Sequence, residues 1–223
     1  MRSIALTIAC VLLLFAVSGI FAQEAVIKEL TGTVELKKAG SSVWESAARG
    51  QTLMQDTIIS TGFKSSALIG IGNSVLTVRP LTRLSLKELS STREAETINV
   101  SLQTGRLRVD VKPPAETRAN YFTVQTPPAT ASVRGTVFEV DLSGLWVIEG
   151  TVVYKSVSGN TVLVDAGGNS FVDGNTGRAA MQLETKLAEL TIVAPIGTDA
   201  INTPNGVTQT SGDLVFIGQF DYD

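Results

Sequence analysis

The sequence contains no histidine and only one cysteine, and these two absences restrict the chemistry available to the protein. Histidine is the usual general base of enzymes, the partner of serine nucleophiles and the most common zinc ligand. Cys10 lies inside an N-terminal apolar run, so removal of that run would leave no thiol for catalysis, a disulfide or metal binding. No carboxylate pair or serine–lysine pair has a spacing typical of hydrolases. We therefore predict a protein that is not an enzyme and carries no cofactor.

The chain also lacks any excess or cluster of positive charge. Its 223 residues include 18 Lys and Arg against 21 Asp and Glu, a formal net charge of −3, and the basic residues are scattered along the sequence. Such a chain is poorly suited to the phosphate backbone of DNA or RNA, and we predict no nucleic-acid partner. The hydrophobic fraction of 43% is sufficient for one packed core.

Residues 1–22 have the order of a secretory signal. Met1-Arg2-Ser3 is a short basic start, Ile4–Phe15 is almost wholly apolar, and the small residue Ala22 precedes polar residues. Cleavage after Ala22 would place a mature chain that begins at Gln23 in the periplasm. The uncharged run is also about long enough to cross a bilayer, which needs ~20 residues, so an uncleaved anchor is the alternative and would be the protein's membrane contact.

Alternation of apolar and polar residues dominates from Ala25 to about Phe171. Arg106–Lys112 and Val137–Asp141 are clear examples, and turn residues such as Ser158-Gly159-Asn160 separate the runs. This alternation directs one set of side chains into a core and the other into water. Short strands with frequent turns are typical of a β-sandwich or barrel, and no helical pattern lies between them. We predict an all-β fold.

The tripeptide Gly-Thr-Val occurs three times, and each copy opens an alternating run. The three glycines are Gly32, Gly135 and Gly150. Glycine adopts backbone angles closed to other residues, and the β-branched pair after it favours an extended chain. The uneven spacing argues against a repeat of fixed period. We predict that the three copies mark the starts of strands in one domain.

Thr126–Val140 places one arginine and one glycine between a proline-stiffened segment and an alternating strand. This segment resembles the signature of the FecR-domain family, which has Thr-Pro, then small and apolar residues, then Val-Arg-Gly-Thr-x-Phe. Weaker matches in the same order extend the resemblance over about Glu24–Asp173, among them Asp56–Gly62 and Val147–Val152. The signature positions are Thr126, Pro127, Arg134, Gly135, Thr136 and Phe138.

The resemblance implies an all-β, jelly-roll-like sandwich in the cell envelope, with an extracytoplasmic recognition role. In the best-known members the domain relays a signal from an outer-membrane receptor to a cytoplasmic sigma factor, through a cytoplasmic segment before a membrane helix. Only Met1-Arg2-Ser3 precedes the apolar run here, so we do not expect this chain to signal across a membrane alone. We predict a recognition or assembly module that binds another envelope protein or a small envelope ligand. The alternative is a periplasmic sensor that acts with a separate membrane signalling protein.

Arg134 has two candidate roles. Its planar guanidinium could bind a carboxylate of a ligand or partner protein. It could also pair internally with Glu139 or Glu149 and hold two strands together. We expect the internal pair, and therefore a structural role for the signature residues.

Two other segments have a functional and a structural interpretation. Asp165–Asn169 and Asp173–Gly177 offer oxygen ligands for calcium but do not follow the spacing of an EF-hand, so we predict turns there and no metal site. Trp44 and Trp146 could form an aromatic platform for a sugar, but both lie in strand-like patterns, so we predict that they pack in the core.

The sequence changes character after Phe171. Good helix formers with leucines on one face predict a short helix over Ala179–Leu190, and Gly197–Gly212 is a polar linker. Leu214–Phe220 is a final apolar strand that either completes a sheet edge of the sandwich or adds to an exposed edge of a partner. We expect the first of these roles. The predicted parts are the signal peptide 1–22, the FecR-like β domain 23–175 and the C-terminal region 176–223.

Overall fold

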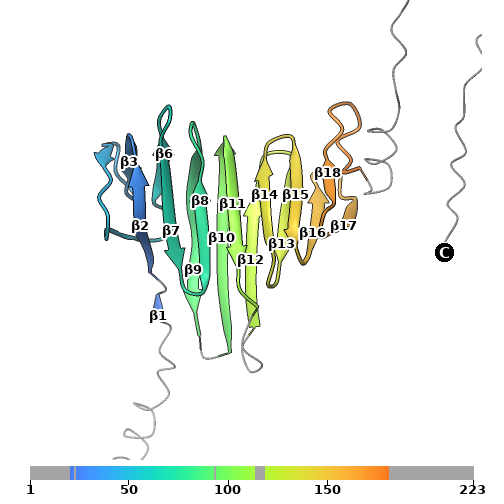
Figure 1. The fold of residues 1–223 in the computed structure, drawn as a ribbon, viewed down its shortest axis with the longest axis horizontal. Helices are drawn as coiled ribbons and strands as arrows, with labels where there is room; N and C mark the ends of the chain where they lie inside the picture. Colours follow the sequence, from blue (N-terminus) through green and yellow to red (C-terminus); the bar gives the residue numbers. More distant parts are fainter. Residues whose placement is uncertain (1–20, 23, 93, 114–118, 181–223) are drawn as a thin grey trace, which may run out of the picture. The chain divides into compact units, whose positions relative to one another are not determined.

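The computed structural model describes residues 21–22, 24–92, 94–113 and 119–180, and within them it contains β-strands and no helix (Figure 1). The strands form two sheets. Sheet A runs in the order β17 (Thr161–Asp165), β16 (Thr151–Ser156), β13 (Ala129–Val133), β12 (Ala119–Gln125), β10 (Ala95–Thr104), β9 (Arg83–Ser91), β6 (Ile58–Thr61), β3 (Val34–Lys37) and β4 (Glu45–Ser46), and β1 (Phe21–Ala22) also pairs with β9. Sheet B runs in the order β18 (Asn169–Phe171), β15 (Gly144–Glu149), β14 (Val137–Asp141), β11 (Arg106–Val111), β8 (Ser74–Val78), β7 (Ser66–Ile71), β2 (Ala25–Thr31) and β5 (Thr52–Leu53).

The order of strands in each sheet nearly follows the order of the chain, as the colour progression in Figure 1 shows. Neighbouring strands are antiparallel except for β10 and β12, which are parallel because the chain passes through β11 in the other sheet between them. The all-β prediction is confirmed. A jelly roll places strands distant in sequence side by side through Greek-key connections. The jelly-roll arrangement that the resemblance implied is therefore not confirmed.

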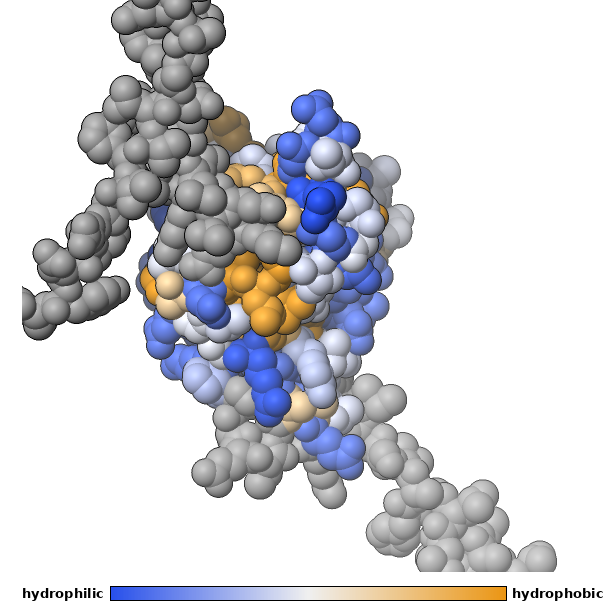
Figure 2. All heavy atoms as spheres, turned by 90° about the vertical axis from the view of Figure 1, so that its right-hand side faces the viewer, coloured by the Kyte–Doolittle hydropathy of each residue, from blue (hydrophilic) through white to orange (hydrophobic). Residues whose placement is uncertain are grey.

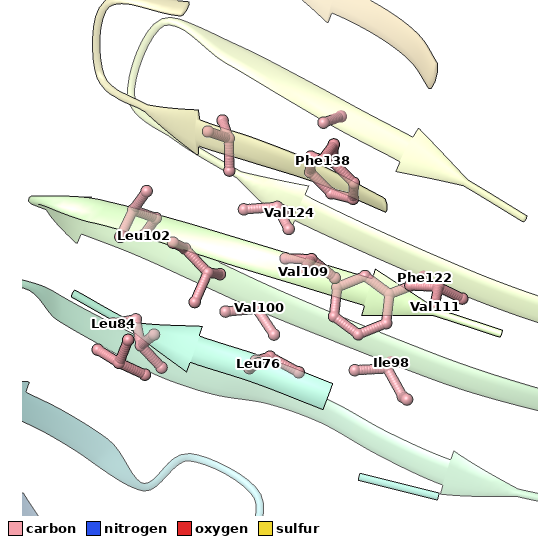
Figure 3. Packing of buried hydrophobic residues seen from close by; sticks show 14 of the residues in the cluster. Leu76, Leu84, Ile98, Val100, Leu102, Val109, Val111, Phe122, Val124 and Phe138 are labelled. Carbon is pink, nitrogen blue, oxygen red and sulfur yellow. The ribbon is translucent and has the colours of Figure 1, made fainter. Parts of the chain in front are cut away.

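Side chains from the inner faces of both sheets form the core. Figure 3 shows Val100 and Phe122 of sheet A pointing toward Val109 and Phe138 of sheet B. The alternation in the sequence is the cause, because inward residues such as those of β10 are buried at every second position. Full burial of one such side chain stabilises the fold by about 1.5–3 kcal/mol.

The chain crosses repeatedly from one sheet to the other, and the corners share one backbone feature. From β2 to β18, each crossover whose connecting residues are all described contains a residue with positive φ. Glycine adopts this conformation without steric cost, whereas other residues are strained there. These corner residues are Gly32, Gly50, Asp56, Lys64, Leu81, Gly105, Gly135, Gly150 and Gly167.

A serine or threonine follows most of these corner residues. Several of these side-chain hydroxyls form a hydrogen bond with a backbone group of a neighbouring corner. The buried Thr136 hydroxyl donates to the carbonyl oxygen of Thr151 at 3.1 Å. The buried Thr82 hydroxyl oxygen accepts the Arg106 N–H at 3.0 Å. Such bonds satisfy peptide groups that the sheets leave unpaired at their ends. The Ser65 hydroxyl oxygen accepts the Thr33 N–H in the same way, at 2.8 Å.

The three Gly-Thr-Val copies all lie at corners, so their prediction as strand starts is confirmed. Strands begin at Val34, Val137 and Thr151, directly after the triplet glycines or one residue later. The corners at Gly135 and Gly150 are also stacked on each other. A Cβ atom on Gly150 would lie 2.9 Å from the Gly135 carbonyl oxygen, closer than real Cβ contacts allow.

Several predicted segments lie wholly or mostly outside the described residues. These are the signal peptide up to residue 20, the linker and the terminal strand Leu214–Phe220. The helix predicted from Ala179 is described only at its first two residues, and these make β contacts instead: Ala179 bridges Val172, and the Ala180 N–H donates to the Phe171 carbonyl. In the described part of the chain, no helix has the length and apolar character needed to cross a bilayer.

We expect Gly150→Ala to destabilise the fold by roughly 2–4 kcal/mol, because the new methyl group meets both a left-handed backbone and the adjacent corner. Gly40→Ala is the matched control: Gly40 also has positive φ, but no atom lies within 4 Å of the added Cβ. The control should lose only about 1 kcal/mol. Urea unfolding of both variants measures the difference, and equal losses would contradict the stacking of the corners.

Tyr154 gives a second prediction. It is fully buried, its hydroxyl has no hydrogen-bond partner among the described residues, and burial together with the Asp141 carboxylate raises its pKa to about 12. Because the folded state favours the neutral phenol, stability is complete below the ordinary pKa of 10.0 and is lost as pH rises toward 12. Tyr154→Phe should be neutral or up to about 1 kcal/mol more stable at pH 8, with a smaller loss at pH 11. A variant clearly less stable at pH 8 would show that the hydroxyl has a partner.

Candidate functional site

The first half of the signature forms the turn between β12 and β13. The Thr126 hydroxyl donates to the Ala129 carbonyl at 2.9 Å, and the Thr126 N–H donates to the same oxygen at 2.8 Å. Pro127 lies between these residues and is exposed. Thr126 and Pro127 therefore fix a hairpin turn, and their contacts are local.

The second half of the signature forms the corner between β13 and β14. Gly135 has φ +75°, and a Cβ there would lie 2.9 Å from the Cα of Pro113. Thr136 is buried and makes the corner bond to Thr151, and Phe138 is fully buried in the core. These three signature residues have structural contacts.

Arg134 is the one charged residue of the signature, and it is exposed and makes no ion pair or hydrogen bond with a described residue. The internal pair with Glu139 or Glu149 is therefore not found. The Glu139 carboxylate instead accepts a hydrogen bond from Arg79 Nη2 at 2.7 Å, and its Oε1 lies 3.7 Å from Arg108 Nη1. The physical reason is the crossover: Arg134 follows β13 in sheet A, whereas Glu139 points out of β14 in sheet B.

Arg134 directly follows β13, whose last residue Val133 pairs with Phe122 on one side and with Val152 on the other. Extension of this register by one position sets Arg134 between Tyr121 and Thr151, in a row of outward side chains on sheet A. Tyr121 is 57% exposed. The Thr151 hydroxyl donates to Asp165 Oδ1 at 2.8 Å. We call Tyr121, Arg134, Thr151 and Asp165 the Arg134 row.

The Arg134 row continues into apolar side chains on the same face. At the next outward position of β16 and β17, Val153 pairs with Leu163, and these side chains are 42% and 63% exposed. An arginine beside a tyrosine and exposed aliphatic residues is a composition typical of protein interfaces. The guanidinium offers five donors in a fixed fork that matches a carboxylate.

A second cluster lies on the outer face of sheet B, which we call the Arg106–Trp146 cluster. The Arg106 guanidinium lies 4.8 Å from the centre of the Trp146 ring and donates from Nη2 to Asp141 Oδ2 at 2.7 Å. Trp146 also packs edge-on against Phe171, with ring centres 5.4 Å apart. Cation–π and aromatic contacts of this type contribute about 0.5–1.5 kcal/mol each.

Asp141 is the best-bonded carboxylate of this cluster. Its partial burial would raise its pKa, but hydrogen bonds from the Ser143 hydroxyl, from Arg106 and from the Ser143 and Gly144 N–H groups outweigh this effect. The pKa of Asp141 is therefore lowered from its usual 3.8. The carboxylate closes the β14–β15 turn and also pairs with β11.

The tryptophan predictions were wrong for both residues, because neither side chain is in the buried core. Trp146 stands between buried Leu145 and Val147 and so must point outward. Trp44 contacts Lys37 of sheet A, with the Nζ 5.3 Å from its ring centre. The two tryptophans thus lie with different sheets and do not form one platform.

The Asp-Gly segments form turns, as their sequence predicts. Asp173 Oδ1 accepts the N–H groups of Thr176 and Asn175 at 2.7 and 2.8 Å. Hydrogen bonds from Thr176 and Asn175 lower the pKa of Asp173. The described residues contain no cluster of three or more metal-ligating side chains.

One hollow of about 260 Å³ lies at the other end of the sandwich, between β3 and β5. Its floor is formed by the buried residues Leu36 and Leu53, and Met54 is exposed at its rim. Its size suits a single apolar side chain or a small apolar molecule. The lining residues are Leu36, Lys38, Ala39, Gln51, Thr52, Leu53, Met54 and Thr57.

The described residues form an all-β domain, and its two notable side-chain clusters, the Arg134 row and the Arg106–Trp146 cluster, lie on the outer faces of its sheets. Residues 57–153 match the family described as FecR protein. This match confirms the predicted resemblance to the FecR family over these residues. The matched residues include all six signature positions and most of both surface clusters.

Two solved structures are similar to the chain, and both are of a candidate anti-sigma factor from Parabacteroides distasonis. They are 16% and 18% identical in sequence, with TM-scores of 0.45 and 0.46. Each similarity covers 55% of this chain and 57% of the solved chain. No curated protein matches the sequence.

Asp141→Asn should lower stability at pH 6, and the difference from the unaltered protein should shrink as pH falls below about 3.8. A carboxylate with a lowered pKa stabilises the folded state above its ordinary pKa, and this contribution is lost as pH falls through the folded value. Urea unfolding at pH 6, 4 and 3 measures the effect.

The matched control is Asp56→Asn, in which the half-exposed carboxylate lies 3.6 Å from Lys87. Exposed ion pairs of this kind contribute less than about 1 kcal/mol, so this variant should change little. Equal and pH-independent losses in both variants would contradict the role assigned to Asp141.

Proposed function

We propose that the protein is a non-enzymatic recognition module of the cell envelope that binds another protein through the Arg134 row. The observation that carries the proposal is the position of Arg134. It is the one signature residue that is exposed, charged and without a partner among the described residues. Its guanidinium keeps all its donors for a partner, and the chemistry it fits best is a carboxylate on an acidic segment.

The surface around Arg134 favours a protein over a small ligand. The row, which includes the exposed Tyr121, lies on the outer face of a sheet beside the aliphatic side chains of Val153 and Leu163. Small molecules are usually bound in concave sites that bury most of their surface. The hollow described above lies instead between β3 and β5, near Leu53.

The family supports a regulatory role. The resemblance to FecR proteins supports a regulatory role that involves another protein. The N-terminal signal predicted over residues 1–22 would deliver the domain to the periplasm. A second candidate function follows from the family: a sensor that works with a separate membrane signalling protein. The identity of the captured partner distinguishes this sensor from an assembly module.

We expect Arg134→Ala to leave the melting temperature within about 2 °C of the unaltered protein, because the side chain is exposed and has no hydrogen bond or ion pair with a described residue to lose. Capture of the partner from an envelope extract should weaken at least about tenfold, which corresponds to ~1.4 kcal/mol. Immobilised variants and quantitative mass spectrometry of the captured proteins provide the measurement.

The matched control is Arg49→Ala, which removes another exposed arginine that forms no ion pair with a described residue and follows β4 at the other end of sheet A. It should capture the same proteins as the unaltered chain. A large fall in the melting temperature of Arg134→Ala would assign the residue a structural role. Unchanged capture by this variant would remove Arg134 from the binding site.

A further inference from the structure

In the described part of the chain the two sheets end in four edge strands, and one of them is unlike the others. β4 and β5 contain two residues each. β18 is flanked by Ala179 and Ala180, which bond to its end. β17 has five residues, Thr161–Asp165, and forms the edge of sheet A at the right-hand side of Figure 1. A longer edge offers more backbone groups for pairing with another strand.

The hairpin of β16 and β17 determines which backbone groups of β17 point away from the sheet. The Ser156 N–H donates to the Asn160 carbonyl at 3.0 Å, so this pair is hydrogen-bonded. Pairs alternate along an antiparallel ladder, and Thr161 and Leu163 therefore direct their N–H and C=O groups away from β16. No described residue is hydrogen-bonded to the outward groups of these two residues.

β17 also lacks the features that usually protect an edge. It contains no proline, lysine or bulge, and only Asp165 is charged. Its neighbourhood is apolar: Leu163 is 63% exposed, and Val157 in the adjoining turn is 72% exposed. Figure 2 faces this end of the sandwich and shows an apolar patch among hydrophilic side chains. An edge of this kind favours addition of a strand from another chain.

We propose that this edge binds the same edge of a second copy of the chain, so that two β17 strands pair antiparallel about a twofold axis at Leu163. In this register Leu163 of one copy faces Leu163 of the other, and Thr161 faces Asp165. The outward N–H and C=O groups of the two Leu163 residues then bond to each other as a hydrogen-bonded pair. Because the contact uses the β17 edge of both copies, the assembly closes as a dimer.

The aliphatic side chains on the outer face of sheet A are self-complementary in this register. Val153 of β16 pairs with Leu163 of β17, and their side chains are 42% and 63% exposed. When the two Leu163 residues face each other, the Val153 and Leu163 side chains of both copies form one continuous aliphatic stripe across the axis. The stripe removes from water apolar surface that a single copy leaves exposed.

Opposite charges flank this stripe. The Asp165 carboxylate of one copy lies beside Thr161 of the second copy, and Lys155, which pairs with Thr161, follows on the next strand. Lys155 and Asp165 of different copies are then two strand spacings apart, or ~10 Å between Cα atoms, a distance that the long lysine side chain can bridge. Lys155 is exposed and forms no ion pair with a described residue. The two Asp165 residues lie at opposite ends of the paired strands, so like charges do not meet. This complementarity favours a second copy over an unrelated strand.

The dimer goes beyond the recognition function proposed above and does not depend on it. Arg134 follows β13, two strands away from the β17 edge, and takes no part in the pairing. Dimer formation and capture of a partner through Arg134 can therefore succeed or fail separately. Where both hold, the twofold axis sets two copies of Arg134 on the same outer face.

Analytical ultracentrifugation of the chain from Gln23 to Asp223 tests the dimer. The contact is small, so we expect a change from monomer to dimer between about 1 and about 300 µM, with no larger species. Leu163→Lys sets two like charges opposite each other and should raise the Kd of the dimer at least about tenfold. Val43→Lys is the matched control, because Val43 is 61% exposed and lies between β3 and β4. It should leave the Kd unchanged, and circular dichroism verifies that both variants fold.

Cysteine cross-linking tests the register, since the chain from Gln23 has no cysteine of its own. Leu163→Cys sets two cysteines opposite each other with Cα atoms ~5.5 Å apart, a separation that a disulfide spans. Thr161→Cys is the matched control, because its two copies lie about four residues, or ~14 Å, apart along the strands. Mild oxidation should link the first variant at least about tenfold faster than the second.

Four outcomes overturn the proposal. An unaltered chain that stays monomeric over the whole concentration range excludes the dimer. A dimer that Leu163→Lys leaves intact assigns the contact to another surface. Growth beyond a dimer shows that the contact is not closed by a twofold axis. Equal cross-linking of the two cysteine variants contradicts pairing about Leu163.

Discussion

The crossover between the two sheets is the constraint on which the rest of this structure depends. Sheets that pack face to face lie about 10 Å apart, and the chain spans this distance within a few residues many times. Each fully described crossover from β2 to β18 uses a residue of positive φ, and buried hydroxyls such as that of Thr136 bind the peptide of a neighbouring corner. The corners thereby fix which sheet each strand joins. The sheet that a strand joins determines its pairing register and the direction of its side chains. It thereby determines which residues lie on each outer face.

Much of the core was predictable because alternation depends only on local sequence. Phe138 and Val124 are buried where the period of two places them, and Gly32, Gly135 and Gly150 mark corners that only a glycine occupies without strain. The arrangement of strands was not predictable in the same way. β10 and β12 pair directly although β11, which belongs to the other sheet, lies between them in the sequence, and the corners at Asp56, Lys64 and Leu81 carry no glycine to reveal them. The expectation of a jelly roll came from the family resemblance and not from these residues.

The site was harder to predict than the core for a related reason. Arg134 and Glu139 are close in sequence and opposite in charge, which suggested an ion pair, but a crossover at Gly135 sends their side chains to different sheets. The Arg106–Trp146 cluster was missed because tryptophan counts as apolar in any pattern analysis. Its flanking residues Leu145 and Val147 contained the signal, since two buried neighbours in a strand require the residue between them to face outward.

The outer faces of the two sheets differ in how far their charges are already neutralised. On sheet B, Arg106 is paired with Asp141, and Glu139 accepts Arg79 and lies near Arg108, so a partner binding there would have to desolvate existing ion pairs. On sheet A, Arg134 has no such pair with a described residue to give up, and a carboxylate from a partner would add a charge-assisted bond to it. Exposed aliphatic side chains beside it would add buried area at little polar cost. The proposed recognition on sheet A would therefore break no such ion pair, whereas the paired charges of sheet B are better suited to holding β11, β14 and β15 in register.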